Sequence, residues 1–378
     1  MLSLHDGVEQ AVKGMNRYGS MHSVWQIGYS GGKDSACLLS LLVWLVAEKR
    51  IPEPEKCYIT MVDTLQEVPP LIDNMRTLAS IAEGSLGWVP IFIQPAIEDS
   101  FLFQMFGRGL YTPGSNRNRW CTRKLKSDPM RKGEWKRHYD VEETTTLTLY
   151  GSRIDESDTR RSNMLRSCTL EGSECGMGLY MENEGPKYAP LSNWRNCSVW
   201  EWLVTCKKRI GYDPSPLIDL YASIDGDAVL DSISTINGTA RTGCLGCPLV
   251  AEDLALDRLC KHKRWEHLKP FKGLHKLYLS MRDHKKRHRK PPGVKGGRVG
   301  PLTLEARLDG LETVKAMQIE SYRIADANGV QRFTLLSDEL EYLIRKAIRD
   351  KVYPRGWDGS EPVAESSAPS RMQIFNAF

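Results

Sequence analysis

Residues 27–40 read IGYSGGKDSACLLS and place two adjacent glycines, a lysine and three serines between an apolar run and a helical pattern. The segment SVWQIGYS predicts a short buried strand, and Asp34 to Lys49 predicts the helix that follows it. Backbone N–H groups at the N-terminus of a helix bind anions, and the helix dipole strengthens that binding. Gly31 and Gly32 allow a close backbone approach that a Cβ atom would block, and Lys33 adds a positive charge. The stretch therefore predicts a phosphate-binding loop.

The first 155 residues alternate between strand patterns and helical patterns. Further strands are predicted in KCYITMVDT, GWVPIFIQP and TTTLTLYGSR, and helices near Leu102, from about Val68 to Ala82 and from Leu125 to Tyr139. This alternation predicts an α/β fold in which a parallel twisted sheet is flanked by helices. Ligands of such sheets bind beyond the carboxyl ends of the strands, which is where the loop falls. A cysteine-bearing insertion and a helical C-terminal region are expected to follow.

The composition limits the class of protein. The chain has 378 residues, of which 41% are hydrophobic and 26% charged, as in ordinary soluble proteins. The longest mostly apolar run, Ala36 to Ala47, is too short to cross a bilayer, and the N-terminus lacks a secretion signal pattern. We therefore expect a cytoplasmic protein without membrane partners. In a reducing compartment its ten cysteines indicate metal binding or catalysis rather than disulfides.

The loop is not a Walker A motif, because GxxxxGK[ST] is absent. The six residues from Ser30 to Ser35 closely resemble the SGGxDS signature of the PP-loop ATP pyrophosphatases, which belong to the phosphoadenosine phosphosulfate reductase-like superfamily. The resemblance implies that the loop holds the two phosphates that ATP loses together, with the help of Mg²⁺. The catalytic residues that it implies are Ser30, Lys33, Asp34 and Ser35. For Asp34, capping of the helix and binding of the metal stay open as alternatives.

Two later segments extend this resemblance. VDTLQE, with Asp63, Thr64 and Glu67, is similar to the DTGxE segment of sulfonucleotide reductases, which implies contact with the nucleotide ribose. A strand-end turn capped by the aspartate is the alternative. GSRIDESDTRRS resembles the GxRxxES..R stretch, which implies that Arg153 neutralises phosphate charge. The nucleotide-binding residues implied together are Ser30, Gly31, Gly32, Lys33, Asp34, Ser35, Asp63, Thr64 and Arg153.

Three cysteines lie in motifs. Cys244 and Cys247 form a CxxC pair in GCLGC, and Cys121 lies in NRWCTRKLK. A CxxC pair places two thiolates on one turn, where they can bind a metal. With GPLTLEAR at residues 300–307, these motifs resemble in their order the DNA phosphorothioation sulfurtransferases of DndC/SspD type, over about residues 20–310.

That resemblance implies a [4Fe–4S] cluster on four cysteines. Cys121, Cys244 and Cys247 match directly, whereas Cys260, the predicted fourth ligand, lies farther along the chain than in the family. Cys168 and Cys175 are rival fourth ligands. Bound zinc, and free or transiently persulfidated thiols, are the alternatives to the cluster.

The function implied is that of an ATP pyrophosphatase, which forms AMP and pyrophosphate while it activates a DNA backbone phosphate for sulfur incorporation in a bacterial defence system. The implied partners are DNA, a cysteine desulfurase that donates sulfur, and other phosphorothioation proteins. A tRNA thiolase stays open as an alternative, as do a nucleotide-binding subunit without turnover and a sulfonucleotide reductase. SECGMG at residues 173–178 resembles the ECGIH tail of those reductases, but that tail is C-terminal and followed by histidine, whereas this segment is internal and followed by methionine, so the reductase stays only an alternative.

These features predict three regions. Residues 1–155 are expected to form the nucleotide-binding α/β domain, residues 156–270 the rest of the site with the cysteine region, and residues 271–378 a basic linker and helical region. Eight Lys or Arg residues lie between Arg282 and Arg298 in a stretch broken by prolines and glycines. Such a run predicts salt-dependent contact with DNA phosphates, and a solubilising loop is the alternative.

Overall fold

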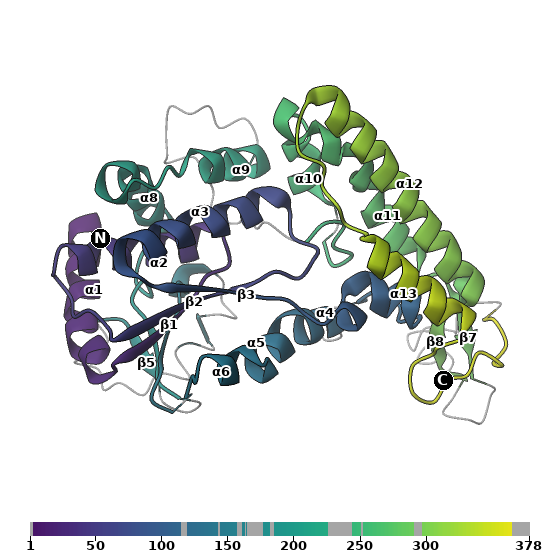
Figure 1. Cartoon of the computed structure of the whole chain (residues 1–378), viewed down its shortest axis with the longest axis horizontal. Helices are drawn as coiled ribbons and strands as arrows, with labels where there is room; N and C mark the ends of the chain where they lie inside the picture. The colour runs from purple at the N-terminus through teal and green to yellow at the C-terminus, as the bar shows by residue number, and fades with distance from the viewer. Residues whose placement is uncertain are drawn as a thin grey trace, which may run out of the picture. The chain divides into compact units, whose positions relative to one another are not determined.

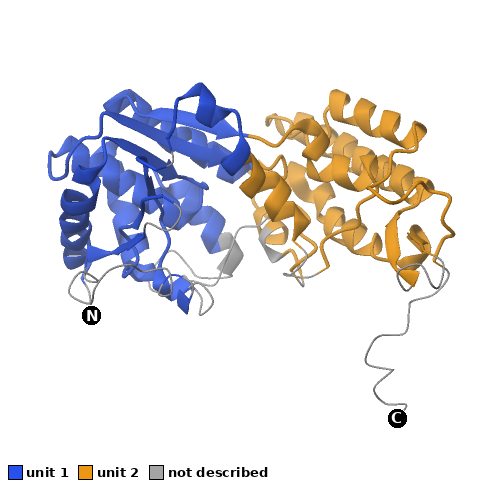
Figure 2. Ribbon diagram, turned by 90° about the horizontal axis from the view of Figure 1, so that it is seen from below, with its two compact units in different colours: residues 1–63, 67–93, 130–242 blue, residues 64–66, 94–129, 243–378 orange. Residues whose placement is uncertain are grey.

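The computed structural model describes residues 3–114, 119–142, 144–156, 161–162, 164, 177–181, 185–225, 244–250, 252–290 and 297–364. These residues form two compact units, each built from segments that are not consecutive in the sequence (Figure 2). The first unit contains residues 1–63, 67–93 and 130–242, and the second contains residues 64–66, 94–129 and 243–378. The boundaries of the two units therefore differ from those predicted at residues 155 and 270, because residues 94–129 belong to the same unit as residues 243–378.

The first unit is built on a six-stranded sheet with the order β3-β2-β1-β4-β6-β5 (Figure 1). All neighbouring strands pair in parallel except β5 and β6, which are antiparallel. Its strands are β1 (Val24–Gly28), β2 (Lys56–Val62), β3 (Val89–Ile93), β4 (Leu147–Leu149), β5 (Leu179–Met181) and β6 (Lys187–Ala189). The predicted α/β class with a parallel-dominated sheet is confirmed. The chain leaves β1 toward β2 on one side, and β4 pairs with β1 on the other. This reversal marks the edge of the sheet where ligands bind in such folds.

Helices cover both faces of this sheet. The helical segments of the first unit are α1 (Leu4–Tyr18), η1 (Gly19–Met21), α2 (Lys33–Ala47), α3 (Pro69–Leu86), α6 (Trp135–His138), η6 (Ile154–Glu156), α8 (Asn196–Ile210) and α9 (Ser215–Asp225), and α5 (Asp128–Lys132) spans the boundary between the units. Helix α2 is almost wholly apolar, because it packs on the sheet and also against α3 and α8. On the other face Trp135 and Tyr139 pack against Tyr58 and Ile91 of the strands. Helix α8 packs against α1 as well as α2.

The second unit is mostly helical. It contains η2 (Ile97–Asp99), η3 (Phe103–Gly107), α4 (Trp120–Thr122), η5 (Arg123–Ser127), α10 (Leu254–Leu259), η9 (Lys263–Lys272), α11 (Gly273–Ser280), η10 (His284–Lys286), β7 (Arg287–Arg289), β8 (Val299–Leu302), α12 (Leu304–Asn328) and α13 (Asp338–Arg349). The predicted C-terminal helices are confirmed as α12 and α13, and hydroxyl groups cap both N-termini: Thr303 accepts from the Ala306 N–H, and Ser337 from the Leu340 N–H. Within the described ranges, every helix is too short or too polar to span a bilayer.

Part of the stretch predicted as a basic linker has regular secondary structure. Residues 284–286 form η10 and residues 287–289 form β7, which pairs with β8 in a two-stranded sheet. Arg287 and His288 are buried, and the Arg287 Nε donates to the Gly300 carbonyl over 2.9 Å. In the sequence, Lys and Arg side chains that donate to backbone carbonyls have the same pattern as side chains that face solvent.

Arg307, in the GPLTLEAR segment, is wholly buried and holds part of the second unit together. Its guanidinium donates to the carbonyls of Phe106 (2.8 Å) and Val352 (3.0 Å), and also to that of Gly107. Phe106 and Gly107 end the π-helix η3, where backbone carbonyls have no partner within the helix. Burial lowers the pKa of Arg307 to about 10, still far above neutral pH. The charged side chain therefore joins α12, η3 and the segment after α13.

Arg307→Met should destabilise the protein by about 3 kcal/mol, because three buried carbonyl groups lose their donor. A urea titration followed by circular dichroism measures this change. Arg323→Met on the same helix is the matched control, since that guanidinium is exposed and pairs only with Glu320. Equal stability of the two variants would contradict this role of Arg307.

Candidate functional site

The phosphate loop lies between β1 and α2 in the first unit. Gly31 has a φ of +73°, a left-handed conformation that favours glycine, and a Cβ atom there would lie 2.7 Å from the Leu71 carbonyl oxygen. Gly32 is the N-cap of α2, so the helix begins at Lys33. The first N–H groups of the helix have no acceptor within it and point to the loop. The predicted anion-binding geometry is therefore present.

The two serines of the loop have different environments. Ser35 is buried, accepts a hydrogen bond from the Ser30 N–H over 3.2 Å and donates to the Gly32 carbonyl over 3.0 Å. Ser30 is exposed, and its Oγ lies 3.1 Å from the Ser35 Oγ. Ser35 thus fixes the shape of the turn from inside, whereas Ser30 offers its hydroxyl group at the surface.

A buried asparagine supports the loop from α3, and the sequence reading missed it. Asn74 Nδ2 donates to the Gly31 carbonyl over 2.7 Å. Its Oδ1 accepts from the Tyr212 hydroxyl over 2.6 Å, and its carbonyl accepts from the Tyr29 hydroxyl over 3.0 Å. Burial raises the pKa of both tyrosines, so both hydroxyls stay protonated as donors. Asn74 could have been identified from the sequence as a polar residue on the buried face of the predicted helix from Val68 to Ala82.

Asp34 lies at the centre of a buried charge cluster. Its Oδ1 accepts from Arg153 Nε over 2.6 Å, and its Oδ2 lies 3.1 Å from Lys33 Nζ. Arg153 is only 2% exposed and also donates to the Trp194 carbonyl over 3.3 Å. The structure thus assigns Asp34 a third role, neither helix cap nor obvious metal ligand, because both its oxygens are engaged by cations. The cluster keeps one positive charge in excess, which suits an anionic ligand.

A second glycine lets β4 approach the loop. Gly151 follows β4, and a Cβ atom on it would lie 2.6 Å from the carbonyl oxygen of Asp34. Arg153 reaches Asp34 two residues later. The neighbouring strands β1 and β4 therefore place the loop and Arg153 together, as the two motifs predicted.

The predicted pair Asp63 and Thr64 is divided between the two units. Asp63 follows β2, and its N–H donates to the Ile93 carbonyl over 3.0 Å. Thr64 belongs to the second unit, where its Oγ1 lies 3.9 Å from the Cys244 Sγ. Contact of Asp63 and Thr64 with a nucleotide ribose stays a prediction. The hydroxyl group of Thr64 lies near the Cys244 thiol.

Cys121, Cys244 and Cys247 are all half-buried in the second unit. The CxxC pair forms a turn in which the Cys247 N–H donates to the Cys244 carbonyl over 3.2 Å. Burial raises the pKa of the Cys121 thiol, and the proximity of Cys247 adds to this rise. The fold therefore brings Cys121 near a cysteine that is more than a hundred residues away in the sequence.

Helix α11 and the residues after it position these cysteine segments. His275 Nδ1 lies 3.0 Å from the Cys247 carbonyl. Arg282 donates to the Pro248 carbonyl over 2.7 Å and also to the Pro113 carbonyl, so it joins the segments that carry Cys247 and Cys121. Sequence reading assigned Arg282 to a DNA-binding run and missed this role, since only the fold shows which carbonyls it meets.

Residues Thr64–Gln66 also contact the segment that carries Cys244 and Cys247. The Leu245 N–H donates to the Gln66 carbonyl over 2.7 Å, and the Tyr278 hydroxyl donates to Gln66 Oε1 over 3.4 Å. The Phe101 ring stacks on Trp120 at 5.3 Å between centroids, next to Cys121 in the chain. Trp120 therefore serves packing, and its indole N–H donates to the Tyr111 carbonyl.

Cys260 is buried at the C-terminal cap of α10. Burial raises the pKa of its thiol to about 12, while the charge of Lys272 lowers this pKa and that of Asp257 raises it. Its rivals Cys168 and Cys175 lie outside the described residues. Across the described ranges, no three His, Cys, Asp or Glu side chains are placed so that they could hold a metal ion. The predicted cluster, its fourth ligand and the zinc alternative stay predictions.

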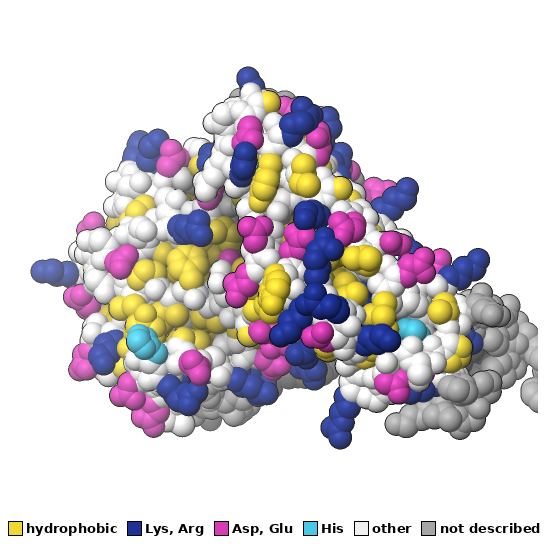
Figure 3. Space-filling model, turned by 45° about the vertical axis from the view of Figure 1, so that its right-hand side comes forward, with side chains coloured by type: hydrophobic (Ala, Val, Ile, Leu, Met, Phe, Trp, Pro, Cys, Tyr) yellow, Lys and Arg dark blue, Asp and Glu magenta, His cyan; other side chains and the backbone are white. Residues whose placement is uncertain are grey.

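The described Lys and Arg side chains of the basic run differ in exposure, with Arg287 buried, Lys285 and Arg298 exposed and the others half-buried. Between Arg282 and Lys290 only Asp283 and Lys285 are exposed, and Lys290 pairs with Glu361. Elsewhere on the surface, acidic side chains lie beside a short band of Lys and Arg (Figure 3). A DNA-binding role for this run stays a prediction, and its side chains from 282 to 290 give it little support.

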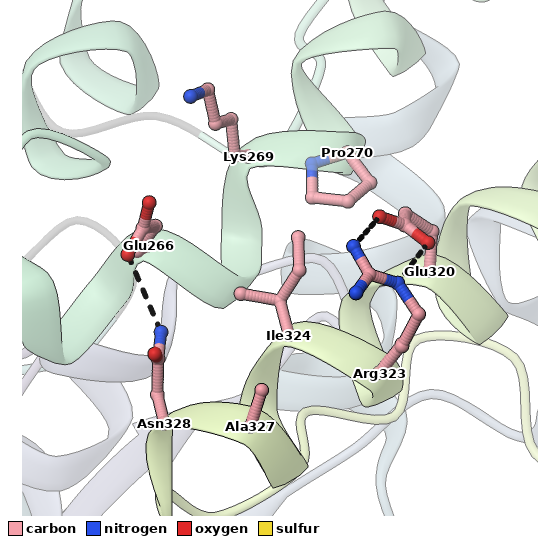
Figure 4. A pocket seen from close by; sticks show the side chains of 8 residues that line it. All are labelled: Glu266, Lys269, Pro270, Glu320, Arg323, Ile324, Ala327 and Asn328. Atoms are coloured by element: carbon pink, nitrogen blue, oxygen red, sulfur yellow. Dashed lines mark hydrogen bonds and ion pairs between the residues drawn. The ribbon is translucent and has the colours of Figure 1, made fainter.

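A surface pocket of about 550 Å³ lies between η9 and α12 (Figure 4). Arg323 pairs with Glu320 at one side, and Asn328 donates to Glu266 at the other, with Ile324 between them. The pocket contains none of the predicted site residues. Because these polar groups satisfy one another, we assign it no role.

Comparison with known proteins supports the assignment of the loop. The family model of the phosphoadenosine phosphosulfate reductase domain matches residues 25–214, about half of the chain. This range contains the phosphate loop, Arg153 and Cys121, but not Cys244, Cys247 or Cys260. No curated protein matches the sequence. The solved structure of the U34-tRNA thiolase NcsA from Methanococcus maripaludis with its [4Fe-4S] cluster is similar at 15% identity and a TM-score of 0.35, over 72% of this chain and 79% of that chain.

Asp34→Asn should destabilise the protein by about 3 kcal/mol, because Arg153 stays buried without a carboxylate. Asp155→Asn is the control, since the Asp155–Arg161 pair has the same chemistry but both side chains are about half exposed. Denaturation in urea measures both. A stability of Asp34→Asn equal to that of Asp155→Asn would show that the charge cluster does not hold β4 to the loop.

Proposed function

Because the chain belongs to the phosphoadenosine phosphosulfate reductase domain family, we propose that it uses a nucleotide in sulfur chemistry and, specifically, that it cleaves ATP to AMP and pyrophosphate to activate a DNA backbone phosphate for sulfur incorporation. The observation that carries the proposal is the phosphate loop with its charge cluster. Lys33 and Arg153 lie around one carboxylate at the N-terminus of α2, so a net positive charge meets the helix dipole.

In the first step, a non-bridging oxygen of the DNA phosphate attacks the α-phosphorus of ATP. The bond from the α-phosphorus to the oxygen bridging the β-phosphate breaks, and pyrophosphate leaves with that oxygen. Charge therefore develops on the pyrophosphate, where loop N–H groups and Lys33 stabilise it. Because the chain holds these donors in place before the reaction, little reorganisation is needed.

Mg²⁺ is implied by the resemblance, and Asp34 does not fit as its ligand while both carboxylate oxygens pair with cations. The phosphate oxygens of the nucleotide are the ligands that Mg²⁺ ordinarily keeps in such sites. When bound, the ion would neutralise phosphate charge. The chain's own contribution is the loop and the charge cluster.

In the second step, sulfur replaces the activated oxygen. The terminal sulfur of a cysteine persulfide attacks the adenylated DNA phosphorus, and AMP leaves. A second thiol then attacks the persulfide sulfur that is bound to cysteine, which leaves sulfur on the DNA and forms a disulfide between the two cysteines. A cysteine desulfurase is the proposed source of the persulfide sulfur. The proximity of Cys121 and Cys247 supports this use of paired thiols.

Lys33→Met should reduce release of pyrophosphate from ATP about 100-fold or more, because a positive charge is lost where charge develops. A coupled pyrophosphate assay with DNA present measures the rate. Lys13→Met, an exposed lysine of α1, is the control and should keep the wild-type rate.

The same variants separate the proposal from its main alternative. The family match also favours a sulfonucleotide reductase, which would release sulfite from phosphoadenosine phosphosulfate. Sulfite formation that is lost in Lys33→Met, with no pyrophosphate from ATP, would replace our proposal with that activity.

Changing Cys244 and Cys247 together to alanine should remove phosphorothioate linkages from the DNA of cells that depend on this protein. Mass spectrometry of digested DNA and digested tRNA measures the products. Cys197→Ala is the control, because Cys197 is exposed on α8 and outside the cysteine region. Loss of thiolated tRNA nucleosides with unchanged DNA would assign the protein as a tRNA thiolase instead.

A further inference from the structure

Tyr221 of α9 lies directly over the phosphate loop. Its hydroxyl oxygen lies 3.4 Å from the backbone nitrogen of Lys33, the first residue of α2. The same oxygen lies 3.2 Å from the position of a Cβ atom on Gly32. It therefore occupies space over the loop, opposite one of the N–H groups that the helix leaves without an internal acceptor.

The ring of Tyr221 also covers the charged group of the loop. Lys33 Nζ lies 5.2 Å from the ring centroid, a cation–π distance. Lys33 is 5% exposed and Tyr221 is equally buried, so the ring and Asp34 together shield the ammonium from water. A polyphosphate cannot reach this ammonium while the ring stays in place.

The position of Tyr221 is supported from behind. Trp200 of α8 packs edge-on against the Tyr221 ring at 5.3 Å, and α9 packs against α3. Among the described residues the Trp200 indole N–H is buried without a hydrogen-bond partner. Trp200 thus supports the tyrosine ring by an edge-to-face packing contact.

We propose that Tyr221 occupies an anion position of the phosphate loop and that a nucleotide binds by displacing it. The phenol oxygen is a neutral acceptor at a site where the helix dipole and Lys33 favour negative charge. A phosphate oxygen at the Lys33 N–H interacts favourably with both the helix dipole and the Lys33 ammonium. Replacement of the phenol oxygen by a phosphate oxygen therefore favours nucleotide binding. Tyr221 thereby keeps the loop ordered and its lysine covered until a polyphosphate arrives. This inference rests on the proposed function only in taking the loop as the phosphate site.

Calorimetric titration with inorganic pyrophosphate tests the displacement. Tyr221→Leu, which removes the hydroxyl and the ring, should bind pyrophosphate about tenfold more tightly than the wild type. Tyr221→Phe, which removes only the hydroxyl, should bind it about threefold more tightly. Tyr58→Phe is the matched control, because that hydroxyl donates to the Tyr139 carbonyl over 3.0 Å, away from the loop, and it should leave the affinity unchanged.

A second readout follows the ring itself. Displacement should change the tryptophan fluorescence when pyrophosphate binds, and Trp200→Phe should remove that change while binding persists. Unchanged or weaker binding in both Tyr221 variants would overturn the inference, because the tyrosine would then not compete with phosphate. A fluorescence change that survives in Trp200→Phe would also overturn it.

The two proposals fail in different ways. Equal pyrophosphate affinity in the wild type and both Tyr221 variants, with pyrophosphate still released from ATP, would reject only the displacement. Tighter binding in the Tyr221 variants without any ATP cleavage would reject the proposed activity and keep the displacement. Absence of pyrophosphate binding in every variant would reject both.

Discussion

The carboxylate of Asp34, shared between Arg153 and Lys33, is the interaction on which the candidate site depends. It joins the turn after β1 to the segment after β4, which are neighbours in the sheet but more than a hundred residues apart in the sequence. A buried guanidinium without its partner would be costly, so the pair holds the two segments in one arrangement. The positive charge that is left over is the property that a phosphate site needs.

In the second unit, hydrogen bonds to backbone carbonyls, two of them from the charged Arg282 guanidinium, join the segments near the cysteines. The segments of Cys121 and of the CxxC pair meet because α11 and Arg282 contact both and Gln66 closes the other side. Thr64, which was predicted for the nucleotide site, belongs to the second unit, where its Oγ1 lies 3.9 Å from the Cys244 Sγ.

The arginines of this chain cannot be told apart by sequence pattern, but they have different partners in the structure. Arg153 pairs with a carboxylate, whereas Arg282, Arg287 and Arg307 donate to backbone carbonyls in the second unit. Arg287 and Arg307 are buried, and burial lowers the pKa of each to about 10, which leaves both charged at neutral pH. A basic run in the sequence therefore predicts phosphate binding only where its side chains reach the surface, and here Arg287 is buried whereas Lys285 and Arg298 are exposed.

The sequence alone predicted the sheet class, which the structure confirms, together with the anion-binding loop and the CxxC motif of Cys244 and Cys247, because these depend on local spacing and on the general rule for the ends of parallel strands. The position of Arg153 near the loop was implied by the family resemblance. Only the tertiary structure decided that Asp34 binds two cations, that Asn74 and Tyr221 contact the loop from α3 and α9, and that Arg282 joins the cysteine segments. These contacts join residues that are distant in the chain, and their side chains have no periodicity that marks a partner. Local patterns specify what each segment can form, whereas the packing of segments decides which polar groups meet.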